Sequence, residues 1–154
     1  MRSLILIPAL TLTAFTAAFA SDPELAVVVN KASTVATISL GDLRQMVLGE
    51  KEKWPDGKKV TSVETPPDSP ERALALKTVF KMNEAVLKRY LMHAAFTGQV
   101  LAAPKVIGSA AALKEYVGRT PGAIGCILAA DVDETVKVLK VDGASPGEPA
   151  YKLR

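Results

Sequence analysis

Short apolar runs separated by polar segments divide the chain, after its first 21 residues, into alternating strands and helices. A β-branched run ending at Asn30 predicts a buried strand, and an alternating pattern near the C-terminus predicts a final, half-exposed one. Turn signals, among them Trp54-Pro55-Asp56-Gly57 and Thr120-Pro121-Gly122, separate these runs from their neighbours. The four strands expected from this pattern span residues 26–29, 60–63, 123–128 and 135–141.

Four helices are predicted between these strands, each starting at a residue whose side chain can accept a hydrogen bond from the first turn. These N-cap residues are Ser39, Ser69, Asn83 and Ser109. The apolar positions expected to face the core are Leu43, Met46 and Val47 in the first helix, Ala73, Leu76 and Phe80 in the second, and Val86, Leu87, Tyr90, Leu91 and Ala94 in the third. Strands alternating with helices predict one α/β domain, a mixed β-sheet packed by helices.

The first 20 residues have a different character from the rest of the chain. Arg2 precedes an apolar run, and Ala18-Phe19-Ala20 has the small-x-small pattern of a cleavage site. This pattern predicts a signal peptide over 1–20 and an exported domain over 21–154, in the periplasm or secreted. The alternative is a membrane anchor, but the run is shorter than the roughly 20 residues a spanning helix needs. No stable membrane insertion is expected after cleavage.

Composition excludes several classes of site. The net charge of +3 is too small to predict a nucleic-acid partner. One cysteine, Cys126, permits no disulfide within the chain, and one histidine, His93, permits no pair of imidazole ligands. No metal or cofactor is therefore expected. Asp131, Asp133 and Glu134 lack the rest of a calcium loop and are interpreted as a solvated turn.

Catalytic motifs are also missing from the sequence. Ser69 has no base near it in sequence and no nucleophile-elbow pattern around it. Neither G-x-x-x-x-G-K-[ST] nor G-x-G-x-x-G occurs. We therefore expect no catalytic residues and a non-enzymatic protein that acts by binding.

Several short motifs occur in the order found in one family of exported proteins. The motifs are Val27-Val28-Val29-Asn30, Leu48-Gly49 with Trp54 and Asp56-Gly57, the segment 63–72, Phe96-Thr97-Gly98, and Pro121-Gly122-Ala123-Ile124-Gly125. With these motifs the chain resembles the phosphate-binding component of bacterial ABC transporters, and covers about one lobe of that two-lobed, periplasmic-binding-protein-like fold. The resemblance implies transport of a small oxyanion such as phosphate, bound at the start of the helix after Ser69.

The same comparison shows where the chain departs from the family. The ligand loop of the family has an arginine, an aspartate and Ser-Gly-Thr, and Thr65 and Pro67 stand here at the arginine and aspartate positions. Ser69 is kept, but Pro70 removes an N–H donor and Glu71 brings a negative charge to the anion position. The candidate ligand-binding residues are Ser69, Arg72, Glu71, Thr65, Ser33 and Thr34.

Two functions stay open at this point. The first is a solute-binding module for phosphate or another small oxyanion. The second is a binding lobe without its transport ligand, which acts as an interaction domain for an envelope protein or for a second copy of itself. An exposed apolar patch without a pocket would favour the second.

The residue types also have simpler interpretations. N-capping alone explains Ser69, and a paired or solvated arginine explains Arg72. Trp54 is expected to cover one edge of the core rather than to bind a ligand. His93 is expected on an exposed helix face, and Cys126 in the core. The loop lysines 51, 53, 58 and 59 are expected in solvent, with steering of an anionic partner as the alternative.

Overall fold

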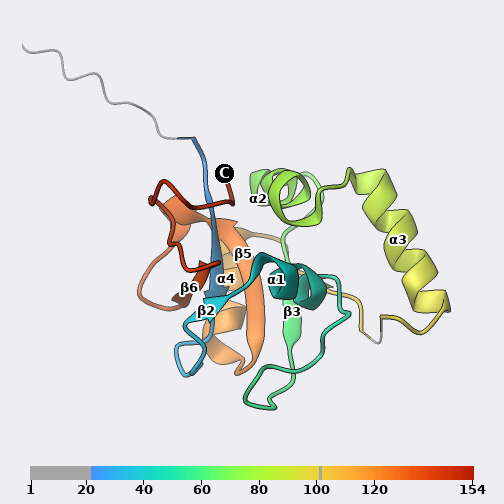
Figure 1. Ribbon diagram of the computed structural model, residues 1–154, viewed down its shortest axis with the longest axis horizontal. Helices are drawn as coiled ribbons and strands as arrows, with labels where there is room; N and C mark the ends of the chain where they lie inside the picture. Colours follow the sequence, from blue (N-terminus) through green and yellow to red (C-terminus); the bar gives the residue numbers. More distant parts are fainter. Residues whose placement is uncertain (1–21, 101) are drawn as a thin grey trace, which may run out of the picture.

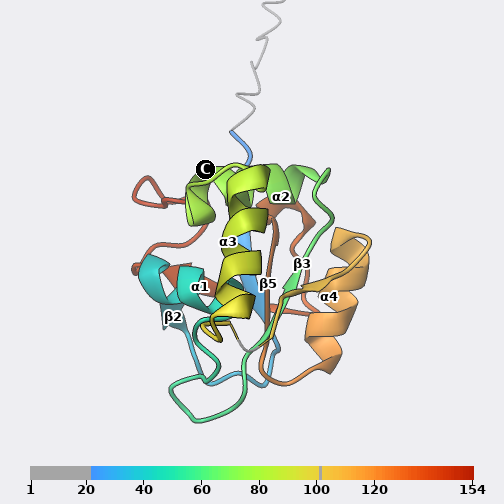
Figure 2. The same cartoon turned by 90° about the vertical axis from the view of Figure 1, so that its right-hand side faces the viewer.

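A computed structural model describes residues 22–100 and 102–154. The chain forms a mixed six-stranded sheet with helices on both faces, so the predicted α/β fold is confirmed (Figure 1, Figure 2). The predicted signal peptide, 1–20, lies outside the described residues. The strands are β1 (Leu25–Val29), β2 (Thr37–Ile38), β3 (Thr61–Glu64), β4 (Lys105–Val106), β5 (Ala123–Leu128) and β6 (Lys137–Val141). The helices are α1 (Leu40–Val47), α2 (Pro70–Ala75), α3 (Glu84–Phe96) and α4 (Ala110–Arg119), with a π-helical turn η1 (Leu76–Phe80) and a 3₁₀ turn η2 (Ala129–Asp131).

The strands lie in the order β2-β6-β1-β5-β3-β4. Strand β1 is antiparallel to both of its neighbours, β5 and β6, whereas β3 is parallel to β5. The four predicted strands are present with shifts of one or two residues at their ends. The edge strands β2 and β4 were not predicted, because each has two residues and is defined by its partner rather than by a local pattern.

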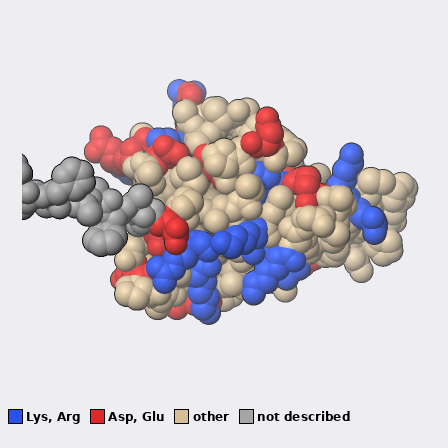
Figure 3. Space-filling view, turned by 90° about the horizontal axis from the view of Figure 1, so that it is seen from above, with Lys and Arg blue, Asp and Glu red and all other residues tan. Residues whose placement is uncertain are grey.

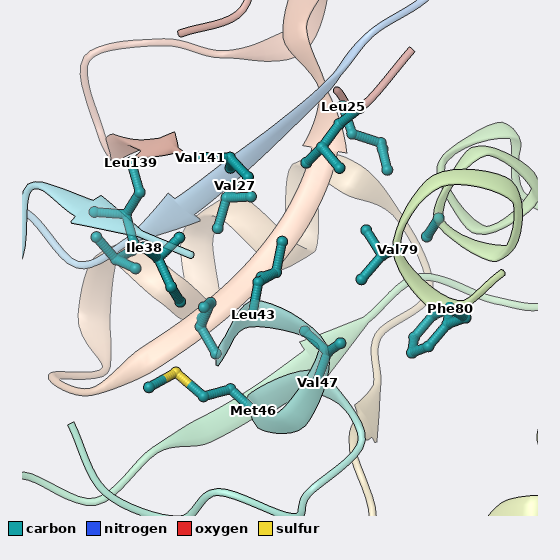
Figure 4. Close-up of a cluster of buried hydrophobic side chains, with 14 of the residues drawn as sticks. Leu25, Val27, Ile38, Leu43, Met46, Val47, Val79, Phe80, Leu139 and Val141 are labelled. Carbon is teal, nitrogen blue, oxygen red and sulfur yellow. The ribbon is translucent and has the colours of Figure 1, made fainter. Parts of the chain in front are cut away.

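Two apolar clusters, one on each face of the sheet, form the core. Leu25 and Val27 of β1 point into the larger cluster, with side chains of α1 and η1 (Figure 4). Ala26 and Val28 point the other way, into a smaller cluster with Leu113 of α4. Because both faces are covered, β1 is a continuous apolar run rather than an alternating one.

All four predicted N-caps are confirmed. The side chains of Ser39, Ser69, Asn83 and Ser109 each accept a hydrogen bond from the backbone N–H three residues later. The predicted inward face of the second helix is partly wrong, because α2 turns Glu71, Arg72 and Ala75 inward in place of Ala73. Ala73 is exposed, and Ala75, Val79 and Phe80 pack in the core.

The predicted inward face of α3 is also partly wrong. Leu87 and Ala94 are buried, but Val86 is 43% exposed. Tyr90 and Leu91 are half-buried. Helix α3 stands away from the sheet at one end of the molecule, so only a narrow stripe of its surface reaches the body (Figure 1).

Trp54 covers one edge of the core, as predicted. Its side chain is 5% exposed, and its indole Nε1–H donates to the carbonyl of Gly122 at 2.9 Å. Gly122 has φ +84°, and a Cβ there would lie 2.2 Å from the carbonyl oxygen of Lys59. Only glycine therefore fits this turn between the Trp54 loop and β5.

The C-terminal residues 151–154, for which the sequence pattern predicts no element, are part of the fold. Tyr151 and Leu153 are buried, and the backbone N–H of Leu25 donates to the carbonyl of Leu153 at 2.8 Å. The Tyr151 hydroxyl donates to the carbonyl of Leu25 at 2.5 Å. The C-terminal residues thus close the core beside the start of β1.

Candidate functional site

The start of α2 is the place where the sequence predicts a ligand. The Ser69 hydroxyl accepts a hydrogen bond from the backbone N–H of Arg72 at 3.2 Å and donates one to the hydroxyl of Thr65 at 2.7 Å. Thr65 is buried. The donor of the Ser69 hydroxyl and one of its two acceptor positions are thus used within the chain, for the loop that leaves β3 and for the helix cap.

Arg72 lies inside the protein rather than at the mouth of a ligand site. It is 5% exposed, and its guanidinium forms ion pairs with Glu64 at the end of β3 and with Glu84 at the start of α3. The contacts to Glu84 measure 2.9 Å from Nε and 3.0 Å from Nη2. The guanidinium also lies 5.6 Å from the centre of the Phe80 ring. Arg72 therefore joins three elements, β3, α2 and α3.

The two carboxylates that hold Arg72 have pKa values shifted in opposite directions. Burial raises the pKa of Glu64, and the attraction of Arg72 offsets only part of this effect. Hydrogen bonds from Arg72 lower the pKa of Glu84, whose side chain is more exposed. Burial opposes the charge of Arg72, but its contacts with both carboxylates outweigh burial and raise its pKa. Arg72 therefore remains a cation.

A small hollow borders this ion-pair network, and its charged groups are mainly acidic. Glu71, in the first turn of α2, is 7% exposed and lines the hollow with Glu64 and Arg72. Cys126 of β5 also lines it, and burial, with a smaller effect of Glu64, raises the pKa of the Cys126 thiol to about 12. Glu64 and Glu84 thus place two carboxylates on a single guanidinium, and Glu71 adds another carboxylate to the lining of the hollow, an arrangement that disfavours an anion.

The structure does not bring all the predicted ligand residues together. Ser33 and Thr34 follow β1, and Ser69 follows β3. Strand β1 is antiparallel to β5 and β3 is parallel to β5, so β1 and β3 run in opposite directions. Their C-terminal ends therefore lie on opposite sides of the sheet along the strand direction. The predicted placement of Ser33 and Thr34 near Ser69 is therefore wrong, whereas Thr65, Ser69, Glu71 and Arg72 do lie together.

Ser33 and Thr34 have local contacts of their own. The Ser33 hydroxyl accepts a hydrogen bond from the backbone N–H of Val35 at 3.3 Å, and the Thr34 hydroxyl donates to Asp56 at 3.4 Å. These contacts shape the loop after β1 and its approach to the Trp54 turn.

The remaining polar candidates lie in solvent or in surface ion pairs. His93 is exposed, as predicted. Lys53, Lys58 and Lys59 are exposed, and Lys51, which is half-buried, pairs with Asp42. In the described part of the chain no three histidine, cysteine or acidic side chains are grouped to hold a metal ion. None of the helices within 22–100 and 102–154 has the length and apolar character needed to cross a bilayer.

Sequence reasoning missed the partners of Arg72. Neither Glu64 nor Glu84 was predicted as such a partner. A usable signal exists, because an arginine on the core side of a helix needs a carboxylate partner. The orientation of α2, which turns Arg72 inward and Ala73 outward, has no comparable signal in the sequence.

No protein-family model matches the chain, and no curated protein matches it. Solved structures do share its fold. An ABC-type phosphate transport receptor from Vibrio cholerae has a TM-score of 0.69 at 20% identity, over 85% of this chain and 53% of its own. PstS from Borrelia burgdorferi has a TM-score of 0.63 at 15% identity, over 80% and 49%. A phosphate-binding protein from Stenotrophomonas maltophilia has a TM-score of 0.59 at 15% identity, over 80% and 40%.

These similarities establish the fold. The predicted resemblance to phosphate-binding proteins of ABC transporters is confirmed at this level, and so is its partial extent. The chain spans about half the length of the structures that it matches.

Proposed function

We propose that this chain is an exported, non-catalytic binding module that works by contact with another protein of the cell envelope and not by holding an oxyanion. The observation that carries the proposal is the position of Arg72, whose guanidinium is shared by Glu64 and Glu84. Arg72, the cation that the sequence offers for an anion at the Ser69 helix start, is thus already neutralised within the chain.

An oxyanion at this position would meet several obstacles. It would have to displace the carboxylate of Glu84 or Glu64 from Arg72, which leaves that carboxylate without its partner. It would also lie near Glu71, which is 7% exposed. Pro70 provides no N–H donor in the first turn of α2. Each of these features raises the free energy of an anion complex.

Location in the periplasm, or secretion, rests on the signal peptide predicted over 1–20 and on the fold shared with phosphate transport receptors. The absence of an enzymatic role rests on the sequence, which has no recognisable catalytic motif, and on the binding-protein fold.

The second candidate function is binding of phosphate or a related oxyanion, in the service of an ABC transporter. It is favoured by the likeness to phosphate-binding proteins and by the Ser69 hydroxyl at the start of α2. This sequence would supply one of the two lobes of such a site, because it spans about half the length of its structural neighbours.

Thermal unfolding separates the two candidates. We expect the melting temperature of the full exported chain to be the same in millimolar phosphate, sulfate or chloride at constant ionic strength. Phosphate at about 100 times its dissociation constant would instead add roughly 2.7 kcal/mol, a rise of several degrees. A phosphate-specific rise that Ser69→Ala abolishes would contradict the proposal and favour the oxyanion candidate.

The protein-contact part of the proposal needs a test of its own. Chemical cross-linking in intact cells that export the chain should give a discrete adduct with an envelope protein. An exported chain that is recovered only as itself, at every cross-linker length, would contradict this part.

A further inference from the structure

Helix α3 forms one end of the molecule and projects beyond the sheet (Figure 1, Figure 2). Of its 13 residues, only Leu87 and Ala94 are buried. Four large hydrophobic side chains are exposed in the described part of the chain, and three of them, Val86, Met92 and Phe96, belong to α3. Phe96 is 89% exposed and Met92 is 55% exposed.

The outward residues of α3 form a continuous stripe. Ala85, Arg89, Met92 and Phe96 are exposed and follow one another at intervals of four, three and four residues. At 3.6 residues per turn, this spacing puts them on one face of the helix. Leu87 and Ala94 lie on the opposite face, so α3 is apolar on two sides. A helix with this pattern is usually covered on both.

The stripe has the chemistry of a protein-binding helix. Phe, Met and Arg are among the residue types enriched at protein interfaces. A helix that binds in a groove contacts it through residues spaced three and four positions apart, as in this stripe. Lys88 and His93 are exposed beside the stripe. Basic side chains border uncharged surface at the α3 end of the molecule (Figure 3).

The charged side chains on the outer face of α3, Lys88 and Arg89, are basic. Glu84 is the acidic residue of α3, and its carboxylate is held by Arg72 at the inner side of the helix. A partner that complements the outer face therefore has an apolar groove with carboxylates at its rim. A second copy of the chain fits poorly. Two such helices face to face would bring Lys88 and Arg89 of one copy close to Lys88 and Arg89 of the other, and these like charges repel.

Two polar contacts fix the helix in this position. The Arg72–Glu84 ion pair holds its first turn, and the Tyr90 hydroxyl forms a hydrogen bond with Glu50 in the loop after α1. Both contacts are on the inner side, so the outer stripe is presented by a helix that is already oriented. Orientation before binding reduces the entropy lost on association.

We propose that the outer face of α3, defined by Ala85, Arg89, Met92 and Phe96, is the docking surface for an envelope protein that offers an apolar groove rimmed by carboxylates. This inference rests on the proposed function and names its surface and the chemistry of the partner. Phe96 is the main apolar anchor, and Arg89 makes the charged contact.

The test is site-specific cross-linking in exporting cells, followed by direct binding. A photoreactive phenylalanine analogue replaces Ala95, which is exposed beside Phe96, and in a control replaces Ala111, which is exposed on α4. We expect a protein adduct from position 95 and none from position 111. The adduct partner is then purified and titrated with the unmodified chain and with variants.

Phe96→Ala is expected to weaken this binding at least tenfold, and Arg89→Glu by a similar factor that shrinks at high salt. Matched controls are Val106→Ala, an exposed apolar residue outside α3, and Arg119→Glu, the same charge reversal on the exposed face of α4. Both controls should bind like the unmodified chain. Circular dichroism checks that every variant is folded.

Each alternative outcome overturns the inference in a different way. An adduct from position 111 alone, or a partner whose affinity does not change in Phe96→Ala, leaves the proposed function standing and rejects this surface. An adduct of two copies of the chain identifies self-association. Phe96-dependent flotation on phosphatidylglycerol vesicles, without a protein adduct, identifies a membrane surface. No adduct at either position, with a phosphate-specific rise in melting temperature, rejects both the surface and the proposed function.

Discussion

Arg72 shows how the contacts of one side chain can change what a binding fold is able to bind. In a buried position a guanidinium has to be neutralised, and here Glu64 and Glu84 provide both partners. The same contacts that satisfy Arg72 hold α3 against the body. Arg72 is thus a structural cation, and the surface that it organises lies on α3 and not around its own guanidinium.

The pKa shift of Glu84 leads to a test of this network. The pKa is lowered by Arg72, so Glu84 stabilises the fold when ionised, above its unfolded pKa near 4.5. This contribution is lost as the pH falls through the lowered, folded-state pKa. Because the Glu84 side chain is 39% exposed, Glu84→Gln should cost only roughly 1 kcal/mol at neutral pH.

The measurement is the free energy of unfolding in urea at a series of pH values from 7 to 3. The difference between the unmodified chain and Glu84→Gln should shrink toward zero at the acidic end, because a protonated glutamate resembles glutamine. Glu115→Gln, on the exposed face of α4, serves as the control and should change stability little at any pH. A difference that is independent of pH would mean that the ion pair does not stabilise the fold.

Among the elements, α2 combines a predictable start with an unpredictable end. Its cap depends on Ser69 and on an N–H three residues away, so the sequence alone reveals it. Its continuation into the π-helical turn η1 depends on how Val79 and Phe80 fit the core. The edge strands β2 and β4, of two residues each, likewise exist only through their pairing with β6 and β3.

The difference between local contacts and contacts that depend on the packed fold also limits what the sequence predicts about the site. Thr65, Ser69, Glu71 and Arg72 are close in sequence, and the structure does place them together. Ser33 and Thr34 required knowledge of strand direction, which a single sequence does not provide. The partners of Arg72 are 8 and 12 residues away, on other elements, so their contacts depend on the packed fold.

The Ser69 cap can be tested on α2 without any ligand. Ser69→Ala removes the acceptor for the Arg72 N–H and the contact with Thr65, and we expect it to lower the free energy of unfolding by about 1 kcal/mol. Ser69→Thr, which keeps a hydroxyl acceptor, should retain most of the stability. Urea unfolding at pH 7 gives both values. Equal stability of the alanine and threonine variants would contradict a capping role.

For the molecule as a whole, the closure of the core depends on contact between β1 and the C-terminal residues. Leu153 is fully buried, and its carbonyl accepts the hydrogen bond from Leu25 that starts β1. The alternation of buried Tyr151, exposed Lys152 and buried Leu153 is that of an extended segment against the core. The C-terminal residues thus belong to the fold, although the segment 143–149, which contains glycine and proline, separates them from β6.

Leu153→Ala measures this closure. The variant removes a fully buried leucine side chain, and we expect a loss of roughly 2–5 kcal/mol in the free energy of unfolding, measured in urea. The neighbouring Lys152→Ala removes only an exposed ion pair with Asp142 and should stay within about 0.5 kcal/mol of the unmodified chain. If Leu153→Ala is as mild as Lys152→Ala, the C-terminal residues do not pack on β1 in solution. In that case the core must be closed at this end by another segment or by a partner.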